Sequence, residues 1–517
     1  MRLTHLVSLS QVDALVQDAL EVLGLVRSTK NNSAPISKIS SDVFSLIPGY
    51  LKDYEEDKNL ITMTHVCHGW RELLIARPSL WTRVNCTNVD KTQVYIERSK
   101  SSPLKLSLYN HGSMACLKAA LALVIPHISR LKSLTLNEVE DWDILRSLTP
   151  YLSRPIPLLS KLMISLGCDP TPDLDTMLFN LSSLCSLSLS GVITHLPWKN
   201  LSKLTTFELF DDPRGGVFIA QLLDLFEEAH HLRDIRLYRS IPTMSNAPPG
   251  RVVSIPHLKK LTTSADLAHS ILLDHLSIPA GASLTLTLWF SGNKSPIPDF
   301  LPKSLENLRN IFPISSVNLS LSGFDNHVRL KGPNGGLYML GRMREWEAGN
   351  LPLLDRRFLR SLSCFDFSGT QRLTVTHQEL PGVEAIGKSA PYHVLSRMKD
   401  LRTLTLIQDN LPFILALNPV RKPIQCAPCP KLEKLVLYVD ERESFNIKEL
   451  MSMAKERASV GMKFSSITVF DLSKRVLEKR VFTLKQHVTH VDYSRVEGKL
   501  PRWDTVPGDG AIDPLWG

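Results

Sequence analysis

Cysteine is scarce in this sequence, and no hydrophobic run is long enough to cross a membrane. Eight cysteines are scattered over 517 residues, which excludes a small disulfide scaffold and is typical of reduced thiols in a cytoplasmic or nuclear protein. No apolar stretch approaches the roughly 20 residues that a membrane helix needs. Near the N-terminus, Asp13, Asp18 and Glu21 interrupt any signal-peptide core. We therefore expect a cytoplasmic or nuclear protein, or one found in both compartments, without a membrane partner.

A strong charge of one sign is also missing. The formal net charge is +9, with 21% charged and 7% aromatic residues, so the charge permits an acidic partner without requiring nucleic acid. Glu478 interrupts the densest basic cluster, 474–480, which favours a solvated helix face over a nuclear-localisation signal. Basic and aromatic residues are dispersed, and nucleic-acid binding is not expected.

Sequence patterns typical of catalytic, metal-binding or phosphate-binding sites are sparse as well. Cys426 and Cys429 form a C-x-x-C pair, but no second pair follows at the spacing of a zinc site. His65, Cys67 and His68 are neighbours in sequence, yet on a helix the cysteine faces away from both histidines. The stretch GPNGG lacks the Lys-Ser/Thr of a phosphate loop and indicates a turn. We expect a non-catalytic protein with no cofactor and no metal.

An amphipathic pattern opens the chain. Its apolar residues recur mostly in steps of three and four, which predicts a helix with one apolar face, followed by a polar, loop-like stretch at 28–33. Residues 1–33 are assigned to this helix and its linker. The apolar positions are Leu6, Leu9, Val12, Leu15, Val16, Ala19, Leu20 and Leu23.

Two further apolar clusters lie between residues 34 and 85. The first consists of Val43, Phe44, Ile47 and Leu51, with Ser40 or Ser41 as its N-cap. The second falls on one face of a helix that should end near Arg77, because Pro78 disfavours helix in the residue before it. Its members are Leu60, Met63, Val66, Cys67, Trp70, Leu73 and Leu74. A unit this small cannot bury so much apolar surface, which indicates a partner.

These clusters resemble the F-box, a short helical module of cullin-based ubiquitin ligases. The pattern V-C-x-x-W at residues 66–70, followed by Pro78, Leu80 and Trp81, carries the resemblance. The lead-in at 34–36 and the segment 96–108 are similar to those of fungal F-box proteins. Ile39-Ser40 stands where the family has Leu-Pro, and Pro48 falls within the first helix of the family.

The resemblance implies that residues 34–85 dock onto a Skp-family adaptor, and through it onto a cullin. Trp70 is expected to be internal, whereas Leu80 and Trp81 are expected at the interface or at the junction with the rest of the chain. The adaptor-binding residues that we predict are Ile39, Phe44, Ile47, Leu51, Val66, Cys67, Trp70, Leu80 and Trp81.

Residues 86–495 carry a recurring L-x-x-L-x-L pattern. The last three positions of each copy predict a strand with one buried face, and the segments between copies show helical spacing. Clear copies begin at Leu131, Leu159, Leu184, Leu204, Leu232, Ile314, Leu362, Leu401, Leu432 and Phe464, and partial copies at Leu258 and Leu284. A spacing of roughly 20–30 residues is typical of leucine-rich repeats; a generic α/β protein rich in leucine is the alternative.

The repeats are expected to be irregular, because the consensus Asn after the strand is mostly missing; Asn137 is a rare candidate. Residues 240–249, 323–350 and 376–391 are predicted to be insertions or long loops, and residues 496–517 form a tail. The predicted fold class is α/β: a small all-α F-box module followed by an irregular leucine-rich-repeat solenoid with a horseshoe shape.

The sequence therefore predicts an adaptor protein. In the favoured interpretation it is the substrate-recognition subunit of an SCF-type cullin ubiquitin ligase, whose repeats hold a substrate protein near the ubiquitin-charged enzyme. The alternative is a leucine-rich-repeat interaction scaffold that works without the ligase. The identity of the substrate cannot be read from the sequence.

Overall fold

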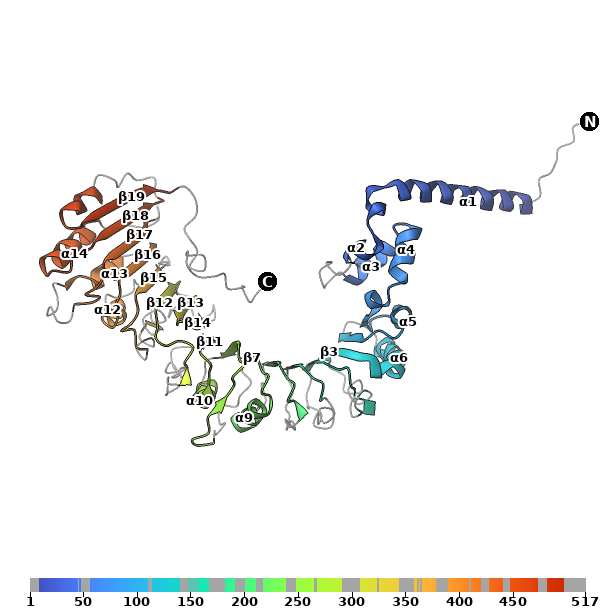
Figure 1. Cartoon of the computed structure of the whole chain (residues 1–517), viewed down its shortest axis with the longest axis horizontal. Helices are drawn as coiled ribbons and strands as arrows, with labels where there is room; N and C mark the ends of the chain where they lie inside the picture. The colour runs from blue at the N-terminus through green and yellow to red at the C-terminus, as the bar shows by residue number, and fades with distance from the viewer. Residues whose placement is uncertain are drawn as a thin grey trace, which may run out of the picture. The chain divides into compact units, whose positions relative to one another are not determined.

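A computed structural model of the chain forms two compact units, residues 1–184 and 185–517. The structure describes residues 9–44, 46–47, 56–109, 114–139, 148, 150–151, 154, 156–166, 182–190, 200–210, 217–238, 248–264, 267–290, 307–322, 325–343, 358–359, 362, 365–377, 389–408, 411–419, 427–439, 447–472 and 481–496. Figure 1 shows the order of the elements along the chain.

The first unit opens with the predicted amphipathic helix, α1, which spans Leu9–Ser33. The prediction of a loop over 28–33 is wrong, because these polar residues continue the helix. Their hydroxyls bond back to carbonyls of the preceding turn: Thr29 Oγ1 donates to Leu25 at 2.9 Å, and Ser33 Oγ donates to Lys30 at 2.7 Å. Such local bonds keep short polar side chains compatible with a helix.

A group of short helices follows α1. It consists of the 3-10 helix η1 (Pro35–Lys38), the helices α2 (Ser41–Phe44), α3 (Glu56–Thr64) and α4 (His68–Ile75), and the 3-10 helix η3 (Pro78–Trp81). The Ser40 hydroxyl accepts the Val43 backbone N–H at 3.4 Å, so Ser40 is the N-cap of α2. Residues 48–55, which include Leu51 and Pro48, lie outside the described residues.

The single helix predicted across the second apolar cluster is divided in two. Cys67 has an extended backbone (φ −159°, ψ 167°) and forms the N-cap of α4. Thr62 and Thr64 precede the break, and their hydroxyls bond to the carbonyls of Lys58 and Ile61 at 2.8 and 2.6 Å. These back-bonds compete with the backbone ladder at the end of α3. The predicted end near Arg77 is confirmed, since α4 stops at Ile75.

A four-stranded stretch of parallel sheet completes the first unit. Its strands are β1 (Arg83–Asn85), β2 (Leu104–Tyr109), β3 (Leu131–Val139) and β4 (Lys161–Leu166), paired in sequence order. The connecting helices are α5 (Val89–Ser99), α6 (Met114–Val124) and the 3-10 helix η4 (Ile125–Arg130). The register slips after Leu104 and again between Leu136 and Val139.

The second unit continues the strand-and-helix pattern over a longer sheet. Its parallel strands are β5 (Ser186–Ser190), β6 (Thr206–Phe210), β7 (Asp234–Tyr238), β9 (Lys260–Ser264), β11 (Ser283–Phe290), β12 (Ser316–Leu321), β14 (Gly336–Met343), β15 (Arg372–His377), β16 (Thr403–Gln408), β17 (Lys434–Val439), β18 (Ser466–Asp471) and β19 (His490–Arg495). One strand, β13 (Asp325–Lys331), is antiparallel to its neighbours, and β8 (Val253–Ser254) pairs with β10 (Leu276–Ser277).

Helices connect many of these strands. They are α9 (Ile219–Glu228), α10 (Leu267–Asp274), α12 (Ser389–Leu395), α13 (Leu411–Ala416), α14 (Ile447–Ser459) and the 3-10 helix η11 (Thr483–Gln486). Helices α12, α13 and α14 lie along one side of β15–β19 (Figure 1). The mixed α/β architecture with a long parallel sheet is compatible with a leucine-rich-repeat solenoid.

The L-x-x-L-x-L copies supply the core of each repeat. Leu204, Phe207 and Leu209 are at most 2% exposed, as are the matching residues of β7, β16, β17 and β18. The first residue of each copy follows a tight turn: the Leu204 N–H donates to the Leu201 carbonyl, and Leu401 and Leu432 repeat this bond. The pattern therefore marks a turn followed by a strand.

One copy is out of phase with the structure. Leu362, Phe365 and Phe367 are buried, but Phe365 and Phe367 lie in the turn before β15 and not in a strand. Thr370 takes the first position of the real copy, and its N–H donates to the Phe367 carbonyl. The L-x-x-L-x-L pattern does not reveal this copy, because a buried threonine occupies the position that leucine fills in the other copies.

A three-stranded meander interrupts the parallel order. β11 pairs with β14, β14 with β13, β13 with β12, and β12 with β15, so three strands are inserted in reverse order. Much of the region 323–350, predicted as an insertion or long loop, is therefore sheet. The GPNGG stretch is the predicted turn, between β13 and β14, and Gly332 donates to the Gly335 carbonyl at 3.0 Å.

Over the part of the chain that the structure describes, we find no helix with both the length and the apolarity needed to cross a membrane.

Candidate functional site

The short helices between residues 35 and 81, called here the helical module, are held together by a small aromatic core. The rings of Phe44 and Trp70 have centroids 4.6 Å apart at an angle of 56°, and the side chain of Phe44 is buried. Arg77 Nη2 lies 2.8 Å from Asp42 Oδ1 and also donates to the Ser41 carbonyl. This ion pair is exposed, so the apolar contact matters more for stability.

Trp81 joins this module to the first strand-and-helix repeat. Its side chain is 1% exposed, and its indole N–H donates to the Leu74 carbonyl at 2.9 Å. The ring meets Tyr95 of α5 edge-on, with centroids 5.1 Å apart. The guanidinium of Arg98, also on α5, lies 4.4 Å from the ring centroid. Trp81 therefore lies at the junction rather than on a free surface.

Among the residues of the module that the structure describes, six large apolar side chains are exposed to solvent. They come from η1, α2 and its following turn, α3, and the break before α4. These exposed apolar side chains make the module a candidate binding surface. The exposed fractions are Ile36 41%, Ile39 38%, Val43 54%, Leu46 59%, Ile61 37% and Val66 54%.

The predicted adaptor-binding residues that the structure describes fall into three groups by their exposure. Ile39 and Val66 are exposed, whereas Phe44 and Trp81 are buried within the chain. Leu51 lies outside the described residues. The remaining four are partly buried: Ile47, Cys67, Trp70 and Leu80.

The sequence reasoning missed four of the exposed residues, namely Ile36, Val43, Leu46 and Ile61. Val43 has the same helical spacing as Phe44, and spacing alone does not say which of two adjacent apolar residues turns inward. Ile36 precedes the predicted helices, and Leu46 lies within the first of them but is not part of its predicted apolar cluster.

A second candidate surface lies on the face of the sheet opposite the leucine core. In neighbouring strands β6 and β7, the rings of Phe210 and Tyr238 stack at 5.2 Å and 12°. The rings of Tyr438 and Phe470 do the same in β17 and β18, at 4.7 Å and 21°. Burial raises the pKa of both tyrosines. Half-buried aromatic residues on a rigid sheet are the kind of anchor that protein interfaces use.

A charged cluster borders the first aromatic pair. Arg236 Nη1 lies 3.2 Å from Glu208 Oε1, and Nη2 lies 3.4 Å from Asp234 Oδ2. Within the part of the chain that the structure describes, Arg236 Nε and Asp234 Oδ1 are buried and have no hydrogen-bond partner.

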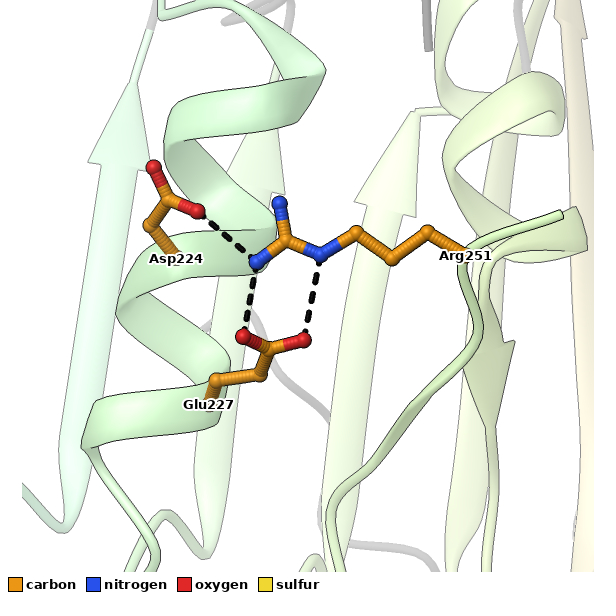
Figure 2. Close-up of polar contacts among 3 residues, drawn as sticks. All are labelled: Asp224, Glu227 and Arg251. Atoms are coloured by element: carbon orange, nitrogen blue, oxygen red, sulfur yellow. Dashed lines mark hydrogen bonds and ion pairs between the residues drawn. The ribbon is translucent and has the colours of Figure 1, made fainter. Parts of the chain in front are cut away.

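Arg251 forms ion pairs with two carboxylates, those of Asp224 and Glu227. Figure 2 shows its guanidinium facing two carboxylates of α9. Nε and Nη2 donate to the two oxygens of Glu227 at 3.0 and 2.8 Å, and Nη2 also donates to Asp224 at 2.7 Å. The guanidinium, by these hydrogen bonds, lowers the pKa of Glu227. The cluster ties α9 to the segment before β8.

The C-x-x-C stretch shows a packing role for Cys429, while Cys426 lies outside the described residues. The Cys429 thiol is fully buried and donates to the Leu395 carbonyl at 3.2 Å, and burial raises its pKa to about 12. Buried Arg457 donates to the carbonyls of Pro428 and Cys429 at 3.0 and 2.8 Å. Among the residues that the structure covers, no three His, Cys, Asp or Glu side chains gather as metal ligands would.

Comparisons with known proteins add little to this picture. No protein-family model matches the chain, and no curated protein sequence matches it. Among solved structures, the "TLR13-ssRNA13 complex" is similar over 79% of this chain and 48% of that chain, with 14% identity and a TM-score of 0.30. The match thus spans about half the length of that protein. At this TM-score the likeness carries no argument, and the fold assignment rests on the strand pairings.

Proposed function

We propose that this protein is the substrate-recognition subunit of an SCF-type cullin ubiquitin ligase. Residues 34–85 act as an F-box that binds a Skp-family adaptor and through it a cullin, and the repeat region binds a substrate protein. The protein has no chemistry of its own and works by holding substrate lysines near the ubiquitin-charged enzyme. It acts in the cytoplasm, the nucleus or both.

The observation that carries the proposal is the exposed apolar surface of the helical module. Phe44 and Trp70 form the core of the module, and Trp81 attaches the module to the first repeat. These side chains therefore already pack within the chain. Ile39, Val43 and the other exposed apolar residues remain uncovered. Together with the V-C-x-x-W pattern of residues 66–70, an uncovered helical surface fits an adaptor-docking role.

The experiment is co-purification of the full chain with a recombinant Skp-family adaptor. Val43→Asp combined with Val66→Asp places two charges on the exposed surface. Burying a valine contributes about 1.5 kcal/mol or more, so we expect the adaptor affinity to fall by about tenfold or more. Trp81 is a poor choice here, because it is buried and its loss would disturb folding.

Leu158→Asp combined with Val252→Asp is the matched control. These side chains are 46% and 51% exposed and lie outside the helical module, so their loss should leave adaptor binding unchanged. If the unsubstituted chain does not bind the adaptor, the ligase assignment is wrong.

The second candidate is a leucine-rich-repeat interaction scaffold that works without the ligase. It is favoured by the aromatic pairs on the sheet, Phe210 with Tyr238 and Tyr438 with Phe470, which offer a binding surface independent of the helical module. Co-purification with the adaptor and a cullin separates the two candidates, since a scaffold retains its protein partner but brings down neither ligase component.

A further inference from the structure

Helix α1 displays an apolar stripe that the rest of the chain leaves bare. Every side chain from Gln11 to Asn31 whose burial is described is exposed. We infer that the stripe pairs with α1 of a second copy of this protein, in antiparallel orientation, to form a homodimer. The large apolar residues and their exposed fractions are Val12 45%, Leu15 65%, Val16 53%, Leu20 57%, Val22 60%, Leu23 45%, Leu25 69% and Val26 61%.

The composition of α1 makes a partner necessary. An isolated helix in water depends on strong intrinsic propensity, because packing supplies most helix stability in proteins. Four valines and the interior Gly24 weaken this helix, and glycine alone costs about 1 kcal/mol relative to alanine. A 25-residue helix of this composition needs an apolar contact along its length to persist.

Four residues of the stripe, together with Ala19, have the spacing of a coiled-coil seam, while Leu15, Leu20 and Val22 flank that seam and Leu25 lies outside it. Val12, Val16, Ala19, Leu23 and Val26 follow one another in alternating steps of four and three, the a/d pattern of helices that supercoil around each other. In an antiparallel pair centred between Gln17 and Asp18, Val12 faces Leu23 of the second copy and Val16 faces Ala19. The pairs repeat on both sides of the two-fold axis, so one register fills every layer.

Charge selects the antiparallel orientation. The first half of α1 carries Asp13, Asp18 and Glu21, and the second half carries Arg27 and Lys30. A parallel pair would place like charges side by side. In the antiparallel register Asp13 and Arg27 flank the seam at matching e positions, so each lies near its opposite in the second copy.

The same charges argue against a membrane surface as the occupant. Helices that lie on membranes carry mainly Lys and Arg on the polar face. Here the polar positions include three acidic and two basic residues, which an anionic lipid surface would not attract. A second copy of α1 complements both the stripe and the charges.

The test is the molar mass of the full chain in solution, by light scattering after size exclusion and by sedimentation equilibrium. We expect about twice the chain mass of 58.0 kDa. Val16→Asp with Leu23→Asp should give monomers, because charges would enter the seam. Ala14→Asp with Gln17→Asp adds the same charge at f and b positions, away from the seam, and should remain dimeric.

Charge reversal tests the orientation. Asp13→Arg alone and Arg27→Asp alone should each weaken the dimer, and the two reversals in one chain should restore it. A monomer at every protein concentration, or a dimer indifferent to the seam substitutions, would overturn the inference. Co-sedimentation with phosphatidylserine vesicles by a chain that is monomeric in solution would instead identify a membrane helix. Adaptor binding is measured in a separate experiment, so the result on dimer formation does not depend on the ligase proposal.

Discussion

The indole Nε1 of Trp81 donates a hydrogen bond to the backbone carbonyl of Leu74 over 2.9 Å. Leu74 lies in the last turn of α4, and its carbonyl also accepts the Arg77 backbone N–H at 3.3 Å. The indole thus caps the helical module from outside, while the same ring packs on Tyr95 of α5. One side chain joins the end of the module to the first repeat.

We expect Trp81→Phe to lower the free energy of unfolding of this junction by about 1 kcal/mol, because the Leu74 carbonyl loses the indole donor but keeps the Arg77 backbone N–H at 3.3 Å. Trp81→Ala should cost about 3–5 kcal/mol through the cavity it leaves. Urea unfolding followed by tyrosine and tryptophan fluorescence measures both. Trp70→Phe is the control: it keeps a ring against Phe44, so a loss as large as that of Trp81→Phe would contradict the assigned role.

The ion pair of Arg251 with Glu227 predicts a pH-dependent contribution to stability. Both Glu227 and Asp224 are more than half exposed, so we expect Arg251→Ala to cost only about 1 kcal/mol. The pKa of Glu227 is lower in the folded chain than its usual 4.5. The contribution is therefore present above that value and is lost as the pH falls through the folded-state pKa.

Urea midpoints of the wild type and Arg251→Ala should differ at about pH 7 and converge at about pH 3. Arg233→Ala removes an exposed arginine just after α9 that makes no ion pair among the described residues, and it should leave the midpoint unchanged. An equal difference at both pH values would show that Arg251 acts through packing alone.

The stability of the fold around buried Arg457 should depend strongly on the planar shape of its guanidinium group. Two nitrogens bond two successive carbonyls, those of Pro428 and Cys429, and the charge stacks 5.1 Å from the Phe464 ring centroid. Lysine offers a single ammonium and cannot reproduce this fork. We expect Arg457→Lys to cost about 2 kcal/mol or more, measured by thermal unfolding. Exposed Lys455→Met, on the same helix, should change little.

In the turn between β13 and β14, Gly332 and Gly335 should not tolerate a side chain. A Cβ on Gly332 would lie 2.5 Å from the Asn310 carbonyl oxygen, and one on Gly335 would clash with the carbonyls of Ala280 and Ala282. Both obstacles are backbone, so Gly335→Ala should cost about 2 kcal/mol or more. Gly281→Ala is the control, because nothing lies within 4 Å of its added Cβ. Equal melting temperatures for the two variants would contradict this account of the turn.

Much of the sheet could be predicted from the sequence, because each buried leucine recurs at fixed distances from a turn. Leu404 and Leu406, for example, mark β16 directly. The copy at Thr370 could not be found this way, since threonine is buried there by context. Nor could the reversed order of β12–β14 be predicted, because strand order depends on pairing between distant segments.

The candidate binding surface was predicted less completely. The surplus of apolar residues before the repeats was visible, and the exposed Ile39 and Val66 belong to the predicted set. The sequence did not show which of these apolar residues are buried and which are exposed. Phe44 is buried, whereas the adjacent Val43 is exposed. The break at Cys67 shifts the faces of α3 and α4 relative to one continuous helix, which periodicity alone cannot show.

The inserted meander also affects how the chain is synthesised. The strand that covers the edge of β11 is β14, which ends at Met343, and not the strand that follows β11. A nascent chain that has emerged only as far as Phe290 therefore holds an open sheet edge, a template for misassembly. The edge stays open until the ribosome has made the whole hairpin, which makes this the point where a chaperone would help most.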